Sequence, residues 1–146
     1  MHDFNKFPEL TNSQMELYYM DSPHRQVTED IWAKCTKVHD GDTISVEWAE
    51  RNFPFQVRLD GIQAPELSEK KGKKSQKYLE HILLGKDVYL NLSKQRVEKW
   101  GRLLCKVYAD GLNANDELVL FGYAMAWKEF NECKLPIIAL PKELKS

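Results

Sequence analysis

Four side chains of this sequence could together act on a phosphate ester. Asp42 lies in the glycine-containing turn Asp40 to Thr43, and Glu66 directly follows a proline. Arg58 and Arg102 carry planar guanidinium groups, which can donate paired hydrogen bonds to phosphate oxygens. Hydrolysis of a phosphodiester needs an activated water molecule, neutralisation of the charge that grows on the phosphoryl oxygens, and often a hard cation. Carboxylates and guanidinium groups can meet these needs, so the four residues form a candidate constellation.

Each of these residues alone also has a structural interpretation, because an Asp-Gly turn often joins two strands and a strand arginine often pairs with a surface carboxylate. Their order is more specific. The sequence reads DGDT at 40–43, RLDGIQAPE at 58–66 and KWGR at 99–102. In this order the motifs resemble those of the staphylococcal nuclease family, also called thermonucleases. The resemblance runs from about Ala33 to Trp127.

The resemblance implies a function and a role for each residue. Glu66 would be the general base on the attacking water, and Arg58 and Arg102 would bind the phosphate and stabilise the transition state. Such an enzyme is a calcium-dependent endonuclease, which hydrolyses phosphodiester bonds in DNA and possibly RNA with little sequence preference. It leaves a 5' hydroxyl and a 3' phosphate.

The resemblance also implies a calcium site, with one departure from the family. Asp42 and the backbone carbonyl of Ala64 would bind the ion, with Thr43 and Asp40 in its outer shell. The family places a further aspartate ligand where this sequence has Gln63. An amide oxygen can coordinate calcium but brings no charge, and the affinity depends on the number of charged ligands. We therefore expect weaker calcium binding, a changed metal preference or an impaired catalyst.

Two further groups are candidates for contacts with nucleic acid. Lys99 and Trp100 match the lysine and tyrosine that contact a terminal phosphate and a base in the family. A basic run follows Glu66 and is either a solvated surface or an electrostatic guide for the nucleic-acid backbone. The run consists of Lys70, Lys71, Lys73, Lys74 and Lys77.

Three hypotheses of function follow from these residues. The first is the nuclease, and the second is a catalytically impaired barrel that binds nucleic acid without cutting it because of Gln63. The third is a protein-interaction module that uses residues 1–29 and the C-terminal tail. The third would show no binding of nucleic acid at low salt.

The pattern of apolar residues predicts the elements that position these side chains. Alternation indicates strands, and Val57 and Leu59 would face a core, so Arg58 would point from the opposite face into an accessible groove. Apolar residues at helical spacing predict an amphipathic helix over 75–84, which Gly85 ends. The other predicted elements are strands near 31–38, 44–48, 55–60, 88–92, 103–107 and 123–127, a loop over 93–101 and a helix over 113–121.

This order of elements predicts an α+β fold dominated by β structure. We expect a five-stranded Greek-key barrel of the oligonucleotide-binding (OB) kind with two or three helices, as in staphylococcal nuclease. The barrel domain would span 30–128. Residues 1–29 would form an extension with a short helix, because Thr11 and Gln14 are spaced like a capping box. Residues 129–146 would form an irregular, proline-broken tail.

Composition limits the number of domains, the class of binding surface and the cellular location that we expect. The 146 residues suit one domain, and the formal charge of -1 provides no overall attraction to nucleic acid, so a phosphate-binding surface must be local. The first residues do not read as a secretory signal and no stretch is long enough to span a bilayer, so we expect a cytoplasmic protein without membrane contact. The cysteines show no zinc spacing; Cys35 and Cys105 would be core residues and Cys133 a surface thiol.

Overall fold

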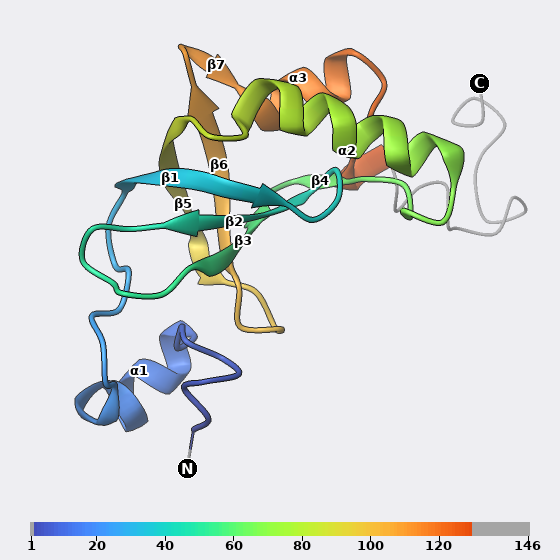
Figure 1. The fold of residues 1–146 in the computed structure, drawn as a ribbon. Helices are drawn as coiled ribbons and strands as arrows, with labels where there is room; N and C mark the ends of the chain where they lie inside the picture. Colours follow the sequence, from blue (N-terminus) through green and yellow to red (C-terminus); the bar gives the residue numbers. More distant parts are fainter. Residues whose placement is uncertain (1, 130–146) are drawn as a thin grey trace, which may run out of the picture.

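A closed barrel of five strands forms the centre of the protein, as the sequence predicted. The computed structural model describes residues 2–129. The barrel strands are ordered β3-β2-β1-β5-β6, and a parallel pairing of β3 with β6 closes the ring. Figure 1 shows α2 and α3 at one end of the barrel and α1 at the other. The elements are α1 (Asn12–Tyr18), η1 (Tyr19–Asp21), β1 (Ile31–Val38), β2 (Thr43–Glu47), β3 (Phe55–Leu59), β4 (Ile62–Gln63), α2 (Lys70–Leu83), β5 (Asp87–Val97), β6 (Leu103–Ala109), β7 (Leu112–Asn113), α3 (Ala114–Leu120) and β8 (Met125–Ala126).

Alternating side chains explain why these segments form a barrel. Along β1, Ile31, Ala33 and Cys35 are buried while the residues between them are exposed. The inward-facing side chains of the five strands make one core, and the helices add Leu79, Leu83 and Leu118 to it. Burial of this apolar surface is the main force that holds the ring closed.

Helix α2 packs one of its faces against the barrel. Its buried residues are Gly72, Ser75, Leu79 and Leu83, of which the two leucines belong to the barrel core. The helix begins at Lys70 rather than at residue 75, because the exposed lysines of its first turns conceal the helical period in the sequence. The lysine run therefore lies on the solvent side of a helix.

The predicted loop over 93–101 is wrong for its first half. Strand β5 continues to Val97, which is buried and pairs with Leu103 of β6 after an irregularity in the register. Arg96 adopts a positive φ of 65° within this irregular part. The polar run that precedes Val97 lacks the alternation of a half-buried strand, so the sequence did not reveal the extension. Only a short turn from Glu98 to Arg102 separates the two strands.

The N-terminal segment packs against the barrel through a buried ion cluster. The predicted capping box is present, since Thr11 and Gln14 exchange hydrogen bonds at the start of α1. Glu9, with 1% of its surface exposed, forms ion pairs with Arg51 and Arg96. These arginines come from the barrel, so the cluster joins the two parts of the chain.

Loss of the Glu9 charge should strongly destabilise the protein. We expect Glu9→Gln to lower the free energy of unfolding by about 3–5 kcal/mol, because two buried guanidinium groups would lose their carboxylate. Urea denaturation followed by tryptophan fluorescence measures this change. Glu29→Gln is the matched control, since Glu29 is exposed and its one ion pair within residues 2–129 is with Arg25 at 3.4 Å. Equal stability of the two variants would contradict the proposed importance of the cluster.

The remaining predictions about the fold concern thiols, domains and the membrane. Cys35 and Cys105 are buried in the core as predicted, and burial raises the pKa of Cys35 to about 11, so its thiol stays neutral. Cys133 and residues 130–146 of the expected tail lie outside the described residues. The division between 1–29 and 30–128 stays a prediction. Among residues 2–129, no helix has the length and apolar character required to cross a membrane.

Candidate active site

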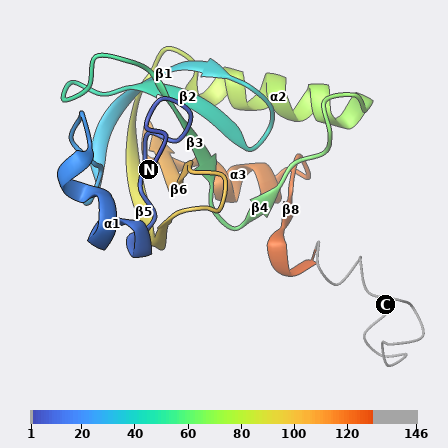
Figure 2. The same ribbon diagram turned by 90° about the horizontal axis from the view of Figure 1, so that it is seen from below.

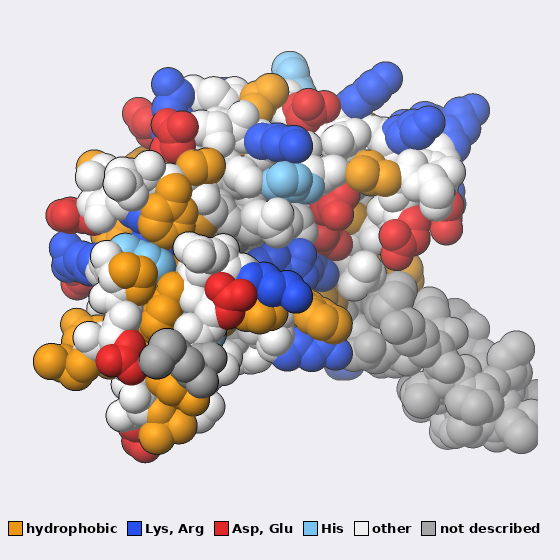
Figure 3. Space-filling view, turned by 60° about the horizontal axis from the view of Figure 1, so that its bottom comes forward, with side chains coloured by type: hydrophobic (Ala, Val, Ile, Leu, Met, Phe, Trp, Pro, Cys, Tyr) orange, Lys and Arg blue, Asp and Glu red, His pale blue; other side chains and the backbone are white. Residues whose placement is uncertain are grey.

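A polar hollow of about 470 Å³ lies against strands β2, β3 and β6. It brings together most of the residues that the sequence suggested, from the turn before β2, from β3, from β4 and from the turn between β5 and β6. Figure 3 shows Lys and Arg side chains beside hydrophobic ones near the middle of the face seen from below. The hollow is lined by Asp40, Asp42, Thr43, Arg58, Gln63, Glu98, Trp100, Arg102, Leu104 and Trp127.

Asp42 is a buried carboxylate whose two oxygens are both held. Its Oδ2 accepts a hydrogen bond from the backbone N–H of Ala64 at 2.9 Å, and its Oδ1 accepts one from the Thr43 hydroxyl at 3.1 Å. The guanidinium of Arg58 lies 3.4 Å from Oδ2. Burial raises the pKa of Asp42 to about 6, and the charge of Arg58 opposes this rise. Asp42 therefore has a fixed position at the inner end of the hollow.

Arg58 borders the hollow but is more enclosed than the predicted accessible groove implies. Only 8% of its surface is exposed, because its guanidinium donates hydrogen bonds to the backbone carbonyls of Leu59 at 2.6 Å and Ile62 at 2.8 Å. Burial lowers the pKa of Arg58, although an arginine remains protonated in proteins. The two carbonyls fix the orientation of the guanidinium, so a phosphate would meet a preorganised donor.

Arg102 is oriented by a partner that the sequence analysis missed. Its Nε and Nη2 donate to the two oxygens of Glu98 at 3.2 and 3.0 Å, and its Nη1 lies 3.3 Å from the hydroxyl of Thr43. Glu98 also accepts from the backbone N–H of Arg102 at 3.0 Å. The sequence did contain a signal for this contact, namely an acidic residue four positions before the arginine with a glycine between them. Glu98 thus fixes Arg102 at the mouth of the hollow.

Trp127 is the second residue that the sequence analysis did not assign to the site. It follows β8, which pairs with β4, and its backbone N–H donates to the carbonyl of Gly61 at 2.8 Å. Its ring lies 5.8 Å from the Arg58 guanidinium carbon. No local pattern indicates this contact, because it depends on the pairing of two strands of two residues each.

Helix α2 packs against both loops that carry candidate carboxylates, namely the turn with Asp42 and the segment with Glu66. A Cβ on Gly41 would overlap the Ser75 side chain, and a Cβ on Gly72 would overlap the carbonyl of Glu66. The helix therefore touches the acidic turn at one position and the Glu66 segment at another. These close contacts require glycine at 41 and 72 and connect both loops to the helix that completes the core.

Glu66 does not line the hollow that contains the arginines. Its side chain is exposed and borders a neighbouring hollow together with Gln63, Ala64 and Lys71. Gln63 lines both hollows, so the two adjoin at this residue. Lys70 is exposed at the start of α2. The structure thus gathers Asp42, both arginines and Trp100 in one place and leaves the candidate base at its edge.

The oxygen atoms near Asp42 match a hard cation in type but supply little charge. The Gln63 amide oxygen accepts from Arg58 at 3.4 Å, and the Gln63 amide nitrogen donates to the carbonyl of Ala64 at 3.3 Å. Calcium prefers carboxylate and carbonyl oxygens, and charged ligands increase its affinity. Within residues 2–129 no group of three or more acidic, histidine or cysteine side chains could hold a metal. By type, these oxygens suit a hard cation, and Asp42 brings the one carboxylate among them.

Comparisons with known proteins give consistent matches. A family model described as "Staphylococcal nuclease homologue" matches residues 56–140. An "Uncharacterized endonuclease" of Escherichia coli O157:H7 is 32% identical over 111 residues, which are 75% of this chain and 70% of that protein. A protein of the same name from Haemophilus influenzae is 35% identical over 98 residues, 67% of this chain and 53% of that protein. A "Probable staphylococcal-like nuclease" of Oryza sativa subsp. japonica is 28% identical over 78 residues, 53% of this chain and 15% of that protein.

Proposed function

Because this chain belongs to the staphylococcal nuclease family, we propose that it is a nuclease that hydrolyses phosphodiester bonds in DNA and RNA with little sequence preference. The observation that supports this most is the hollow in which Arg58 and Arg102 meet beside a buried carboxylate. Two fixed guanidinium groups suit a phosphodiester, because its negative charge grows during hydrolysis.

Arg58, Arg102 and Glu66 have separate roles in the proposed reaction. Arg58 and Arg102 bind the phosphoryl oxygens and orient the phosphorus atom. Glu66, exposed at the edge of the hollow, turns toward the phosphate and takes a proton from a water molecule. The water oxygen then forms a bond to phosphorus while the bond to the leaving oxygen breaks, and the leaving oxygen takes up a proton from solvent. In the orientation known for the family, a 5' hydroxyl and a 3' phosphate result.

Asp42 would hold a calcium ion with the amide oxygen of Gln63 and the carbonyl of Ala64. When bound, the ion would neutralise phosphate charge and polarise the phosphorus centre. Thr43 orients the Asp42 carboxylate through its hydroxyl, and Asp40 accepts from the backbone N–H of Asp42 at 2.9 Å. Since Asp42 provides the one formal charge in the proposed ligand set, we propose weak binding.

The metal proposal predicts a gain of function. Gln63→Asp should lower the calcium concentration for half-maximal activity by about tenfold or more, because a second charged ligand increases calcium affinity. The assay digests plasmid and single-stranded DNA with EDTA or with calcium, magnesium or manganese. Gln95→Asp, on the exposed part of β5, is the matched control. An unchanged calcium requirement in Gln63→Asp would contradict the ligand assignment.

A second candidate is a barrel that binds nucleic acid without cleaving it. Two observations favour it, namely the neutral side chain at Gln63 and the position of Glu66 outside the arginine hollow. This candidate predicts salt-sensitive binding with no cleavage by the native chain in any of the metals. Cleavage that depends on Glu66 would exclude it.

A further inference from the structure

A second hollow adjoins the candidate active site on the side of the N-terminal segment. It measures about 540 Å³, and Trp100 and Arg102 line both it and the active-site hollow. Its other polar side chains come from Asn5, Lys6, Glu9 and Gln56. The turn that carries Trp100 and Arg102 is thus the common wall of two adjoining hollows.

Strand β3 runs beneath both hollows. Gln56 lies two residues before Arg58, so their side chains project from the same face of the strand. Gln56 is exposed and borders the second hollow, whereas Arg58 borders the first. An extended polymer bound at Arg58 could therefore follow the strand toward Gln56.

The charges of the second hollow suit a polyanion. Lys6 is exposed, and no carboxylate within residues 2–129 forms an ion pair with it. Glu9 also lines the hollow, but its carboxylate is enclosed and paired with Arg51 and Arg96. The exposed Asp3 does not line this hollow, although its Oδ1 accepts hydrogen bonds from the backbone N–H groups of Asn5 and Lys6 at 3.1 Å. Arg102 is paired with Glu98, so Lys6 carries the one unpaired charge among the described side chains that line the hollow.

Trp100 stands at the boundary between the two hollows with 62% of its surface exposed. A large exposed aromatic side chain offers a face on which an unpaired base can stack, whatever its identity. Lys99 lies beside it, with its ammonium 5.3 Å from the Trp100 ring. Stacking requires a base that is not held in a duplex, which points to a single-stranded ligand.

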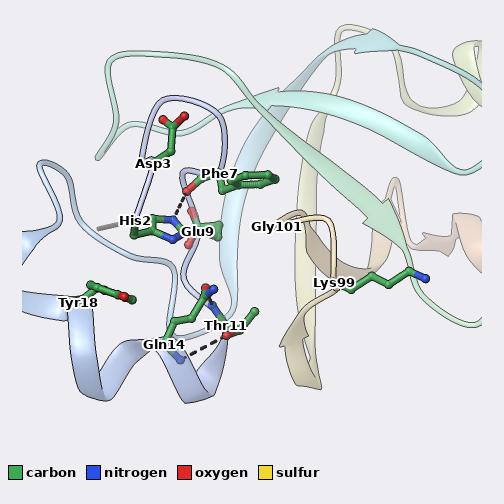
Figure 4. A pocket seen from close by; sticks show the side chains of 9 residues that line it. All are labelled: His2, Asp3, Phe7, Glu9, Thr11, Gln14, Tyr18, Lys99 and Gly101. Atoms are coloured by element: carbon green, nitrogen blue, oxygen red, sulfur yellow. Dashed lines mark hydrogen bonds between the residues drawn. The ribbon is translucent and has the colours of Figure 1, made fainter.

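The N-terminal segment fixes the position of this turn. A Cβ on Gly101 would lie 2.8 Å from the Phe7 ring, so the ring packs directly on the turn. Figure 4 shows the hollow beneath Phe7, in which Lys99 points away from the other labelled side chains. Asp3 lines that hollow and not the one beside Lys6 and Gln56. The hollow of Figure 4 thus combines one exposed carboxylate, Asp3, with the ammonium group of Lys99, so it offers a phosphate chain no excess of positive charge.

We propose that the second hollow is a binding subsite for a single-stranded stretch of nucleic acid next to the phosphodiester that is cleaved. Lys6 binds a backbone phosphate of this stretch, Trp100 stacks with a base, and Asn5 and Gln56 donate to sugar or base atoms. This subsite rests on the proposed function, and it gives the N-terminal segment a role in holding the substrate.

Binding without cleavage tests the subsite. The affinity of a fluorescent single strand of about 12 nucleotides, a length within the range that one barrel of this kind covers, is measured in EDTA by anisotropy. Lys6→Glu and Gln56→Glu should each weaken binding by about 5- to 10-fold, because each places a negative charge beside the strand. Lys6→Ala should reduce the slope of log affinity against log salt by about 0.7, as expected for the loss of one phosphate contact.

The controls separate this proposal from the catalytic one. Lys106→Glu, at an exposed position on β6 outside the hollows, should change binding less than Lys6→Glu. Equal binding of the long strand by native and Lys6→Glu protein overturns the subsite even if the native protein cuts DNA. Absence of cleavage with reduced binding by Lys6→Glu overturns the nuclease proposal, while the second hollow keeps its role as a binding site for a single strand.

Discussion

Replacement of Glu66 by glutamine is expected to lower kcat for DNA hydrolysis by about 10²- to 10⁴-fold, the usual contribution of a general base. Glutamine keeps the size of the side chain but cannot accept the proton of the attacking water. The side chain is exposed, so the stability of the fold should be unaffected. Initial rates on plasmid and single-stranded DNA, with the dissociation constant measured in EDTA, separate catalysis from binding.

Glu69 provides a matched control for this prediction. It is also exposed, borders the same neighbouring hollow and precedes α2 as its N-cap residue. Glu69→Gln should retain activity near the native level. Equal loss of activity in the two variants would indicate that general charge near the hollow matters and would remove Glu66 from the role of base. Full activity of Glu66→Gln would have the same consequence.

Replacement of Arg58 by lysine should also cause a large loss, of about 10²- to 10³-fold in kcat, comparable to the loss of one donor to a developing oxyanion. Lysine retains a positive charge near Asp42 but cannot supply the planar, paired donors of a guanidinium. The loss should occur mainly in kcat, because the donor acts most strongly when charge develops on the phosphoryl oxygens.

The burial of Arg58 requires a stability measurement in the same experiment. Its hydrogen bonds to the carbonyls of Leu59 and Ile62 hold the start of β4, and lysine cannot form both in the same geometry. Urea denaturation therefore accompanies the kinetics, with assays at concentrations where the variant is folded. Arg25→Lys is the control, because Arg25 is exposed and pairs with Glu29 and Glu50 on the surface. A fully folded Arg58→Lys protein with native kcat would exclude the catalytic role.

Much of the fold could be predicted because its signals are local. The strands of the barrel alternate in burial along consecutive residues, and the capping box needs only Thr11 and Gln14. Helix α3 spans Ala114–Leu120, within the range 113–121 that the sequence indicated. Errors arose where a local pattern was hidden, as in the lysine-rich start of α2 and in the polar, irregular stretch of β5 before Val97.

The sequence by itself determined the family and the types of groups available for chemistry. The acidic turn at Asp42, the run from Arg58 to Gln63 and the arginine at 102 can be read from one chain, and so can the missing charge at 63. These features depend on residue type and short spacing. The alternation of side-chain direction along β3 also indicated that Arg58 lies on the face opposite the core-facing residues.

Only the tertiary structure decided which of these groups meet. Arg102 reaches the hydroxyl of Thr43 across 59 positions of sequence because β3 pairs with β6 and closes the barrel. The same closure encloses Arg58, while the loop after β4 leaves Glu66 at the edge of the hollow. The Glu9 cluster brings Lys6 beside Trp100. Such contacts depend on the packing of distant segments around one core, which no spacing within a short motif records.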